Sequence, residues 1–305
     1  MTAVPTLEML RAKLGDAVRA DVPLAPYTSA RIGGPADFLI SAGSSDQLEA
    51  AIKHLWQAGI GYFLLGGGSN VLVSDKGVRG VTILNRAKGV HFHAGSAPGV
   101  WAESGVVFSN LANRCAAKGL SGLEWAATVP GTIGGAVFGN AGAFGGEMAG
   151  NLVWAEVLTR SGREKWPREA MGYGYRSSVL KSHASQAAVL AAELKLSNST
   201  REQVTAQMLQ FGERRKATQP PGASMGSMFK NPAGDAAGRL LEASGLKGSR
   251  IGNAEISRVH ANFFVNLGRA HAQDVRDLIE MARGTVREKF GVELELEIEL
   301  VGDWD

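Results

Sequence analysis

The sequence predicts a globular protein of mixed α and β structure, organised in about two domains. Three observations support this: a length of 305 residues, 45% apolar with 20% charged residues, and an alternation of strand-like and helix-like segments near the N-terminus. The length corresponds to about two domains at roughly 150 residues each. The composition is that of a soluble chain that can bury a core, and the alternation is typical of α/β structure.

The first 85 residues contain two predicted helices and four predicted strands. Leucines at helical spacing predict a short amphipathic helix over residues 7–14. A capping box at Ser44 and Gln47 begins a second helix, which Gly59 ends. Short apolar runs bounded by turn residues predict strands at 38–40, 62–65, 71–73 and 81–84.

The rest of the chain is less regular. Residues 86–197 hold one clear helical segment, 110–118, among glycine loops and short strands. Thr200 and Gln203 form a second capping box, for a helix that ends before Pro220. The remaining predicted elements are a strand at 190–196, a helix around Leu240 and Leu241, a long helix at 275–290 and a strand at 292–301.

Charge and cysteine content exclude several classes of protein. The net charge is +3 without a basic stripe, so we expect no nucleic-acid partner. The single cysteine, Cys115, excludes an intramolecular disulfide, and the scattered histidines give no metal site. No signal-peptide pattern and no run of about 18 apolar residues occur, so we expect a cytoplasmic location without membrane insertion.

One motif suggests a hydrolase and is rejected on its context. Residues 222–226 match the G-x-S-x-G nucleophile elbow, and Asp235 and His260 follow in the chain order of an α/β-hydrolase. The elbow has to join a strand to a helix. Prolines flank this segment, and neither flank is predicted to be regular, which disfavours a hydrolase.

Glycine is the compositional outlier, with 40 residues. Gly66-Gly67-Gly68-Ser69-Asn70 lies between two predicted strands, where successive amides can form an anion-binding nest for a diphosphate. A tight β-turn without a ligand explains this run equally well. A Rossmann site is disfavoured, because the run does not enter a helix. A second cluster, residues 129–143, contains so much glycine that it favours backbone folded around a large cofactor.

Seven motifs in order resemble one enzyme family. They are Arg31-Ile32-Gly33-Gly34, residues 65–70, 130–135, 140–143, Tyr175-Arg176-Ser177-Ser178, residues 226–232 and Glu297. Together they closely resemble the UDP-N-acetylenolpyruvoylglucosamine reductases, the MurB family of bacterial cell-wall synthesis, in its shorter form without an extra substrate-closing loop. Gly139 and Val179-Leu180 depart from the family pattern, where bulkier or aromatic residues are common.

The resemblance implies an α+β fold: a two-lobed FAD-binding domain of the vanillyl-alcohol-oxidase (PCMH) type and a C-terminal α+β substrate-binding domain. We expect domain ranges of 1–85, 86–198 and 199–305. It also implies non-covalent FAD and NADPH as the reductant, with a UDP-sugar as substrate, in a protein expected to be a monomer. The implied cofactor-binding residues are Arg31, Gly66, Gly67, Gly68, Ser69, Asn70, Pro130, Gly131, Gly134, Asn140 and, less directly, Arg215.

The family reaction implies roles for further residues. FAD reduced by NADPH passes hydride to the enolpyruvyl double bond of UDP-N-acetylglucosamine enolpyruvate, which gives UDP-N-acetylmuramate. The enolate that forms needs its carboxylate stabilised and its carbon protonated. The resemblance assigns the first task to Arg176 and the proton to Ser227. Glu297 would orient Arg176 or donate the proton. The implied substrate-binding residues are Tyr175, Lys230 and Asn231.

Each of these assignments has a structural alternative. Arg176 could pair on the surface, and Ser227 could be a turn serine. Glu297 shares a predicted strand face with three other glutamates, which suits a solvated face. Two other functions also stay open: a non-catalytic nucleotide-sugar binding protein of the same fold, and a related flavin oxidase that acts on an alcohol.

Overall fold

The chain forms two compact units, each assembled from separate stretches of sequence. The computed structural model describes residues 5–184 and 186–304. Unit 1 contains the chain up to Arg19, Leu39–Gly67 and Gly80–Arg214. Unit 2 contains Ala20–Phe38, Gly68–Arg79 and the chain from Arg215 on. The glycine run therefore passes from one unit to the other between Gly67 and Gly68, and the domain ranges expected from the resemblance stay a prediction.

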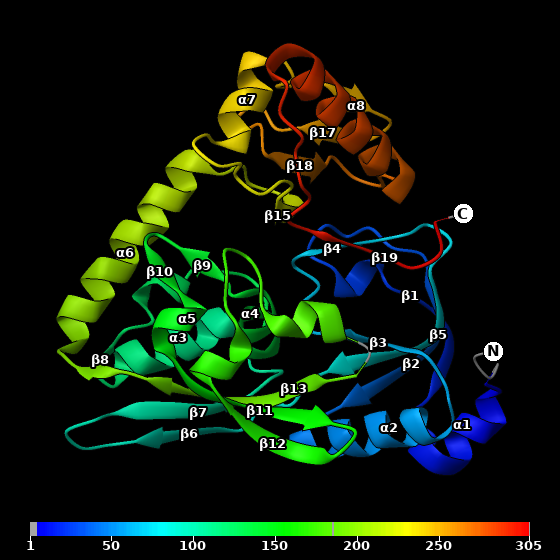
Figure 1. Cartoon of the computed structure of the whole chain (residues 1–305), viewed down its shortest axis with the longest axis vertical. Coiled ribbons are helices and arrows are strands. Elements are labelled where there is room, and N and C mark those ends of the chain that lie inside the picture. Colours follow the sequence, from blue (N-terminus) through cyan, green and yellow to red (C-terminus); the bar gives the residue numbers. More distant parts are fainter. Residues whose placement is uncertain (1–4, 185, 305) are drawn as a thin grey trace. The chain divides into compact units, whose positions relative to one another are not determined.

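A five-stranded antiparallel sheet forms the centre of unit 1, in the order β12-β11-β13-β7-β6 (Figure 1). Its central strand β13 begins with five buried residues, which is expected of a strand covered on both faces. Helix α4 packs against β13 and β7. The strand bounds are β6 (Val90–His93), β7 (Gly99–Glu103), β11 (Leu152–Thr159), β12 (Gly162–Pro167) and β13 (Ala188–Lys195).

The observed helix N-caps confirm the predictions for Ser44 and Thr200, and Thr6 caps a third helix that had no predicted cap. The side chains of Thr6, Ser44 and Thr200 accept hydrogen bonds from Met9, Gln47 and Gln203 amides at 3.2 Å each. The helices are α1 (Leu7–Leu14), α2 (Ser45–Gln57), α3 (Phe108–Ala117), α4 (Ile133–Gly139), α5 (Met148–Asn151) and α6 (Arg201–Thr218). Helices α1, α2, α3 and α6 match predicted ones, whereas α4 and α5 were not predicted.

Helix α4 occupies part of the segment that we predicted as glycine loop. Thr132 is its N-cap, and Ile133, Ala136 and Val137 lie buried at helical spacing. These three residues form an apolar stripe on one face. Its three glycines lower the helix propensity, so tertiary packing sustains this helix.

A second, four-stranded sheet has the order β1-β2-β5-β3. Strands β3 and β5 pair in parallel, with Leu65 opposite Leu84. The strands are β1 (Arg19–Pro23), β2 (Pro35–Ala42), β3 (Tyr62–Leu65) and β5 (Val78–Asn85). The N-terminal 200 residues also contain two short antiparallel pairs: β9 (Gly142–Ala143) with β10 (Gly146–Glu147), and β8 (Leu120–Ser121) with β14 (Ser197–Asn198).

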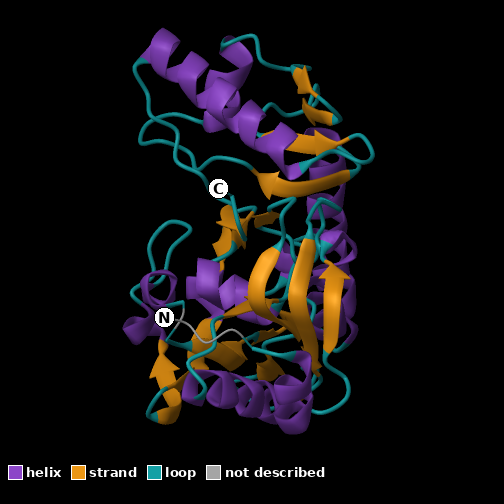
Figure 2. Cartoon of the chain, turned by 90° about the vertical axis from the view of Figure 1, so that its right-hand side faces the viewer, coloured by secondary structure: helices purple, strands orange, loops and turns teal. Residues whose placement is uncertain are grey.

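The C-terminal part of unit 2 is a four-stranded sheet with two helices. The sheet has the order β15-β18-β17-β16, and α8 packs against β16 and β17. In Figure 2 this part is seen as purple helices beside orange strands at the top of the view. The elements are β15 (Ala223–Ser227), α7 (Ala237–Ala243), β16 (Arg250–Ile251), β17 (Ala254–Ile256), β18 (Phe263–Asn266) and α8 (Ala272–Phe290). Ser224 thus lies inside a strand and not between a strand and a helix, which supports the rejection of a nucleophile elbow.

The predicted strand at 292–301 is wrong over most of its length. Only β19 (Glu299–Val301) is a strand, and it pairs in parallel with β4 (Val71–Val73). Residues 292–298 are irregular apart from an isolated bridge between Leu296 and Phe229. Leu294 and Ile298, two of the alternating apolar residues, are buried. Alternation alone, however, does not supply a partner strand.

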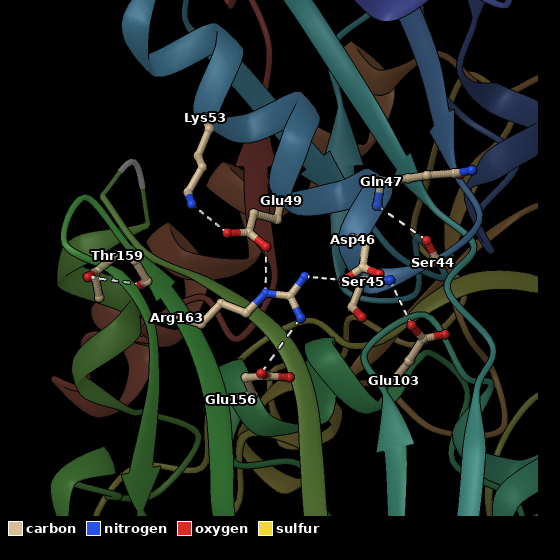
Figure 3. Close-up of polar contacts among 11 residues, drawn as sticks. Ser44, Ser45, Asp46, Gln47, Glu49, Lys53, Glu103, Glu156, Thr159 and Arg163 are labelled. Atoms are coloured by element: carbon tan, nitrogen blue, oxygen red, sulfur yellow. Dashed lines mark hydrogen bonds and ion pairs between the residues drawn. The ribbon is translucent and has the colours of Figure 1, made fainter.

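An ionic network joins α2 to the β11–β12 hairpin in unit 1 (Figure 3). The guanidinium of Arg163 contacts the carboxylates of Asp46 and Glu49 and lies 3.7 Å from Glu156. Lys53 pairs with Glu49 at 2.6 Å. Burial raises the pKa of Glu49, but the hydrogen bonds from Lys53 and Arg163 outweigh it and lower that pKa.

Within residues 5–184 and 186–304, no helix combines the length and the apolar character needed to cross a bilayer.

Candidate active site

In unit 1 the first two glycines of the run are pressed against a second glycine loop. A Cβ placed on Gly67 would lie 2.8 Å from Gly131 Cα, and one on Gly66 would lie 2.6 Å from Thr132 Oγ1. Real Cβ atoms do not approach backbone so closely, so only glycine fits at position 67. The two predicted glycine clusters therefore meet here.

In unit 2 the same run continues against residues 27–29. Gly68 has a φ of +59°, and its Cβ would lie 2.2 Å from the carbonyl oxygen of Tyr27. Its own carbonyl accepts a hydrogen bond from the Ser29 amide at 2.9 Å. Among the described residues, none accepts a hydrogen bond from the backbone amides of Gly66, Gly67, Gly68 or Asn70. These donors are available to an anion.

Asn140 ends helix α4 in the left-handed conformation, with φ 46° and ψ 58°. Its side-chain Nδ2 donates to the carbonyl oxygen of Gly174 at 3.0 Å and to Glu147 at 3.2 Å. Its Oδ1 accepts from the Ala149 amide at 3.0 Å. The residue is also buried. Protein groups therefore use most of the hydrogen-bonding capacity of this side chain, which we had expected to bind the cofactor.

Arg176 lies in a strained turn. The backbones of Gly174 and Ser177 exchange two hydrogen bonds, at 3.1 and 3.2 Å, around Tyr175 and Arg176. Arg176 has a φ of +54°, at a position where turns of this kind favour glycine or asparagine. Its guanidinium carbon lies 5.3 Å from the centre of the exposed Tyr175 ring. Strained backbone of this kind concentrates at functional sites.

Gly142 makes room for the guanidinium of Arg176. A Cβ on Gly142 would lie 2.9 Å from Arg176 Nη1 and 3.0 Å from the carbonyl oxygen of Gly146. The second glycine cluster therefore packs directly against the predicted catalytic arginine. The sequence predicted the arginine but not this contact.

In unit 2, the backbone of Glu297 bonds to the residue that follows Ser227. Ser227 ends β15 opposite Phe263, and Met228 follows it. The amide of Glu297 donates to the carbonyl oxygen of Met228 at 2.9 Å. Asn70 Nδ2 donates to the carbonyl oxygen of Glu297 at 3.1 Å, which ties the glycine run to the same residue.

The remaining predicted residues of unit 2 make contacts of their own. Lys230 Nζ lies 3.1 Å from a carboxylate oxygen of Glu295. Asn231 Oδ1 accepts from the Ala237 amide at 3.1 Å, at the start of α7. The exposed Arg31 has a φ of +55°.

Arg215 is partly buried, and burial lowers its pKa. Within the described part of the chain no carboxylate forms an ion pair with it, and the nearby Gln219 Oε1 is buried without a hydrogen-bond partner. A partly buried guanidinium without a carboxylate is a suitable partner for a phosphate.

Two further predicted cofactor positions lie in unit 1. Pro130 is exposed, and the amide of Gly134 donates to the carbonyl oxygen of Ser104 at 2.8 Å.

Sequence reasoning missed two residues that hold these groups in place. Thr132 caps α4 and contacts Gly66, and its Thr-Ile-x-x-Ala-Val pattern contained a readable capping signal. Asn262 is 3% exposed and bonds both the amide and the carbonyl of Phe229, at 2.9 and 2.8 Å. No local pattern marks Asn262, because its partner lies 33 residues away.

Comparisons with known proteins agree with this arrangement. A family model described as an FAD binding domain matches residues 36–166. The C-terminal domain of UDP-N-acetylenolpyruvoylglucosamine reductase matches residues 217–301. The chain is 44% identical over 292 residues to the reductase of that name from Rubrobacter xylanophilus, covering 95% of this chain and 97% of that protein.

Two further relatives give the same result. The Bacillus subtilis enzyme of that name is 41% identical over 287 residues, covering 93% of this chain and 94% of that one. The crystal structure of UDP-N-acetylenolpyruvylglucosamine reductase (MurB) from Thermus caldophilus superposes with a TM-score of 0.78 at 36% identity, covering 93% of this chain and 99% of that one.

An FAD-binding domain followed by a dedicated C-terminal domain defines a flavin-dependent reductase. The chain belongs to the UDP-N-acetylenolpyruvoylglucosamine reductase family, MurB. This membership confirms the predicted family, fold class and class of activity. The individual site residues stay predictions.

The residues present fit FAD. Only glycine is accommodated at position 67, and the backbone amides of Gly66, Gly67, Gly68 and Asn70 are suited to a diphosphate. Thr128 Oγ1, near the second glycine loop, is also buried without a partner among the described residues.

Proposed function

We propose that this chain is a UDP-N-acetylmuramate dehydrogenase that reduces the enolpyruvyl group of a UDP-sugar to a lactyl ether in peptidoglycan precursor synthesis. NADPH is the proposed reductant, and FAD is bound without a covalent link. The single observation that carries the proposal is the strained turn that presents Tyr175 and Arg176, in a chain of this family. Bound FAD supplies the hydride that the substrate alkene receives.

The chain's proposed task in cofactor binding is to hold the diphosphate with backbone. Gly66 to Asn70 supply amides, and only glycine fits at position 67. Arg31, Pro130, Gly131 and Gly134 contribute to the same cofactor in this proposal, and Arg215 pairs with a phosphate. The prediction for Asn140 is a different case, because its side chain already has protein partners.

Arg176 holds the substrate carboxylate in this proposal. A guanidinium can bind a carboxylate through two parallel hydrogen bonds and keeps its charge at any working pH. Hydride addition at the terminal carbon moves negative charge toward that carboxylate, so the interaction strengthens as the reaction proceeds. Tyr175, beside it in the turn, donates a hydrogen bond to the substrate.

Ser227 delivers the proton to the carbon next to the carboxylate. A serine hydroxyl is a weak acid and needs a polarising neighbour or a relay. Glu297 either supplies that proton or orients Arg176, and its hydrogen bond to Met228 supports a place in the same proton path. Lys230 and Asn231 contact the diphosphate of the UDP-sugar. We further propose that the protein acts as a cytoplasmic monomer.

The visible spectrum of the purified protein tests the proposal. A flavin spectrum, bleached by anaerobic NADPH and restored by UDP-N-acetylglucosamine enolpyruvate, is the expected result. A colourless protein that binds UDP-sugars would indicate a non-catalytic binding protein. A flavin that an alcohol substrate bleaches, and whose colour only oxygen restores, would indicate an oxidase.

A further inference from the structure

Helix α4 and the turn that carries Arg176 are fastened together at three points in unit 1. Tyr173 Oη donates to the carbonyl oxygen of Val137 at 3.0 Å, and Ser178 Oγ donates to that of Phe138 at 2.6 Å. Asn140 Nδ2 donates to the carbonyl oxygen of Gly174 at 3.0 Å. The last carbonyls of a helix lack intrahelical partners. Residues 173 and 178 supply those partners on either side of the turn.

Of the three contacts, the one from Asn140 goes to a residue of the turn itself, Gly174. The backbone of Gly174 also exchanges both hydrogen bonds with Ser177 and so closes the turn. An asparagine amide has two N–H donors, and in Asn140 one bonds Gly174 while the other bonds Glu147. Its oxygen accepts from Ala149. Only 2% of the residue is exposed, which leaves almost no surface for a flavin.

We infer that Asn140 is a positioning residue for Arg176, and that its side chain fixes the carboxylate-binding turn instead of contacting the cofactor. This inference rests on the proposed function, in which Arg176 binds the substrate carboxylate. The left-handed backbone of Asn140 contributes as well, because it turns the chain at the end of α4 toward Ala149 and Glu147. Helix α4 thereby connects the glycine loop at Thr132 with the Arg176 turn.

Two substitutions separate the side chain from the backbone. Asn140→Gly keeps the left-handed conformation, which glycine adopts freely, and removes the three hydrogen bonds. Asn140→Asp keeps an acceptor for Ala149 but removes the donor to Gly174. Asn151→Asp is the matched control. Asn151 is another buried asparagine of unit 1, bonded to Trp125 and Lys195, without a hydrogen bond to residues 173–178.

Binding measurements on the FAD-loaded protein form the first test. With Asn140→Gly we expect the Kd for FAD to stay within about twofold, while the Kd for UDP-N-acetylmuramate, read from the flavin absorption, rises about tenfold, as for one lost hydrogen bond. In an Arg176→Ala background the same change should cause no further weakening, since Asn140 acts through Arg176. A parallel loss of FAD affinity, or additive effects in the double variant, would overturn the inference.

Hydrogen exchange tests the positioning without reference to activity. The amides of Gly174 and Ser177 should exchange faster in Asn140→Gly and Asn140→Asp than in the native protein or in Asn151→Asp. Unchanged exchange at these two amides would overturn the positioning role. If the native holoenzyme failed to bind the UDP-sugar acid, the proposed function would fail, and the exchange data would still decide whether Asn140 fixes the turn.

Discussion

Glu297 donates its backbone amide to the carbonyl oxygen of Met228, the residue that follows Ser227. Two residues that are 69 positions apart in the sequence are thereby joined by a single hydrogen bond of 2.9 Å. Asn262 braces the next residue, Phe229, through two further bonds. The segments that carry Ser227 and Glu297, the residues proposed to deliver the proton, are therefore joined through the backbone of Met228.

Glu297→Gln should leave this backbone intact, because Glu297 makes its contacts with Met228 and Asn70 through its own main chain. We expect FAD binding and the bleaching by NADPH to be unchanged. The restoration of colour by the enolpyruvyl UDP-sugar should slow by about 10²-fold or more, as for the loss of an acid or of the arginine's partner. Stopped-flow absorption of the two half-reactions measures this, and equal slowing of both would contradict the proposed role.

Ser227→Ala should separate the half-reactions in the same way. A methyl group cannot donate a proton, so reoxidation by the sugar substrate should fall by about 10²–10⁴-fold while reduction by NADPH persists. Ser224→Ala in the same strand is the control, since the proposed mechanism gives that hydroxyl no task. Comparable loss in both variants would point to damage of β15 instead of chemistry.

Gly142→Ala should displace Arg176. The new Cβ would lie 2.9 Å from Nη1, and the flexible guanidinium can move away more easily than the backbone oxygen of Gly146. A shift of about 1 Å can cost about 10²-fold in rate. We expect the sugar half-reaction to slow strongly at nearly unchanged thermal stability. Gly150→Ala, where a Cβ meets open space, should have no such effect, and neutrality of both changes would argue against the proposed contact.

Local chemistry in the sequence predicted the regular elements well. Ser44 and Thr200 cap their helices through bonds to residues three positions on, so the signal and its partner lie in one short window. Strands at 62–65 and 71–73 were predicted with their observed bounds, because turn residues flank both. Alternation at 292–298 misled us, since its backbone bonds to the segment around Met228 and not to a continuous strand.

The site was predictable only where a motif carried it. Motifs located Arg176, Ser227 and the glycine run, but they could not show what holds them. The bond between Asn140 and Gly174 spans 34 positions, and that between Asn262 and Phe229 spans 33. A single sequence contains no signal for such distant partners. Composition also concealed helix α4, whose glycines resemble those of a loop.

Two glycine-to-alanine changes should have opposite effects. Gly67→Ala places a Cβ 2.8 Å from Gly131 Cα, where the nearest atoms all belong to the backbone of Gly131 and cannot rotate away. We expect a loss of about 1–3 kcal/mol in the free energy of unfolding of the apoprotein and a clear loss of FAD affinity. Gly139→Ala in α4 meets open space and should stabilise by about 0.5–1 kcal/mol. Urea unfolding and FAD titration measure both, and equal behaviour of the two variants would contradict the close approach at Gly67.

Arg163→Ala should destabilise the protein in a pH-dependent way. Its guanidinium contacts Glu49, whose pKa is lowered in the folded chain, where hydrogen bonds from Lys53 and Arg163 outweigh burial. A lowered folded-state pKa means that this stabilisation is present above the carboxyl's ordinary pKa and disappears as the pH falls through the lowered one. We therefore expect Arg163→Ala to cost about 1 kcal/mol in the free energy of unfolding near neutral pH, and clearly less at about pH 3.

Chemical denaturation of the two proteins at both pH values measures this difference. Arg283→Ala removes an exposed pair with Glu280 in α8 and should cost less than about 0.5 kcal/mol, because solvent screens that pair. The Arg163 side chain is only 29% exposed, and its guanidinium bridges three carboxylates from α2 and β11, so its loss leaves those charges close together with less compensation. A cost for Arg163→Ala that stayed the same in acid would mean that packing of the arginine stem, and not its charge, joins α2 to the hairpin.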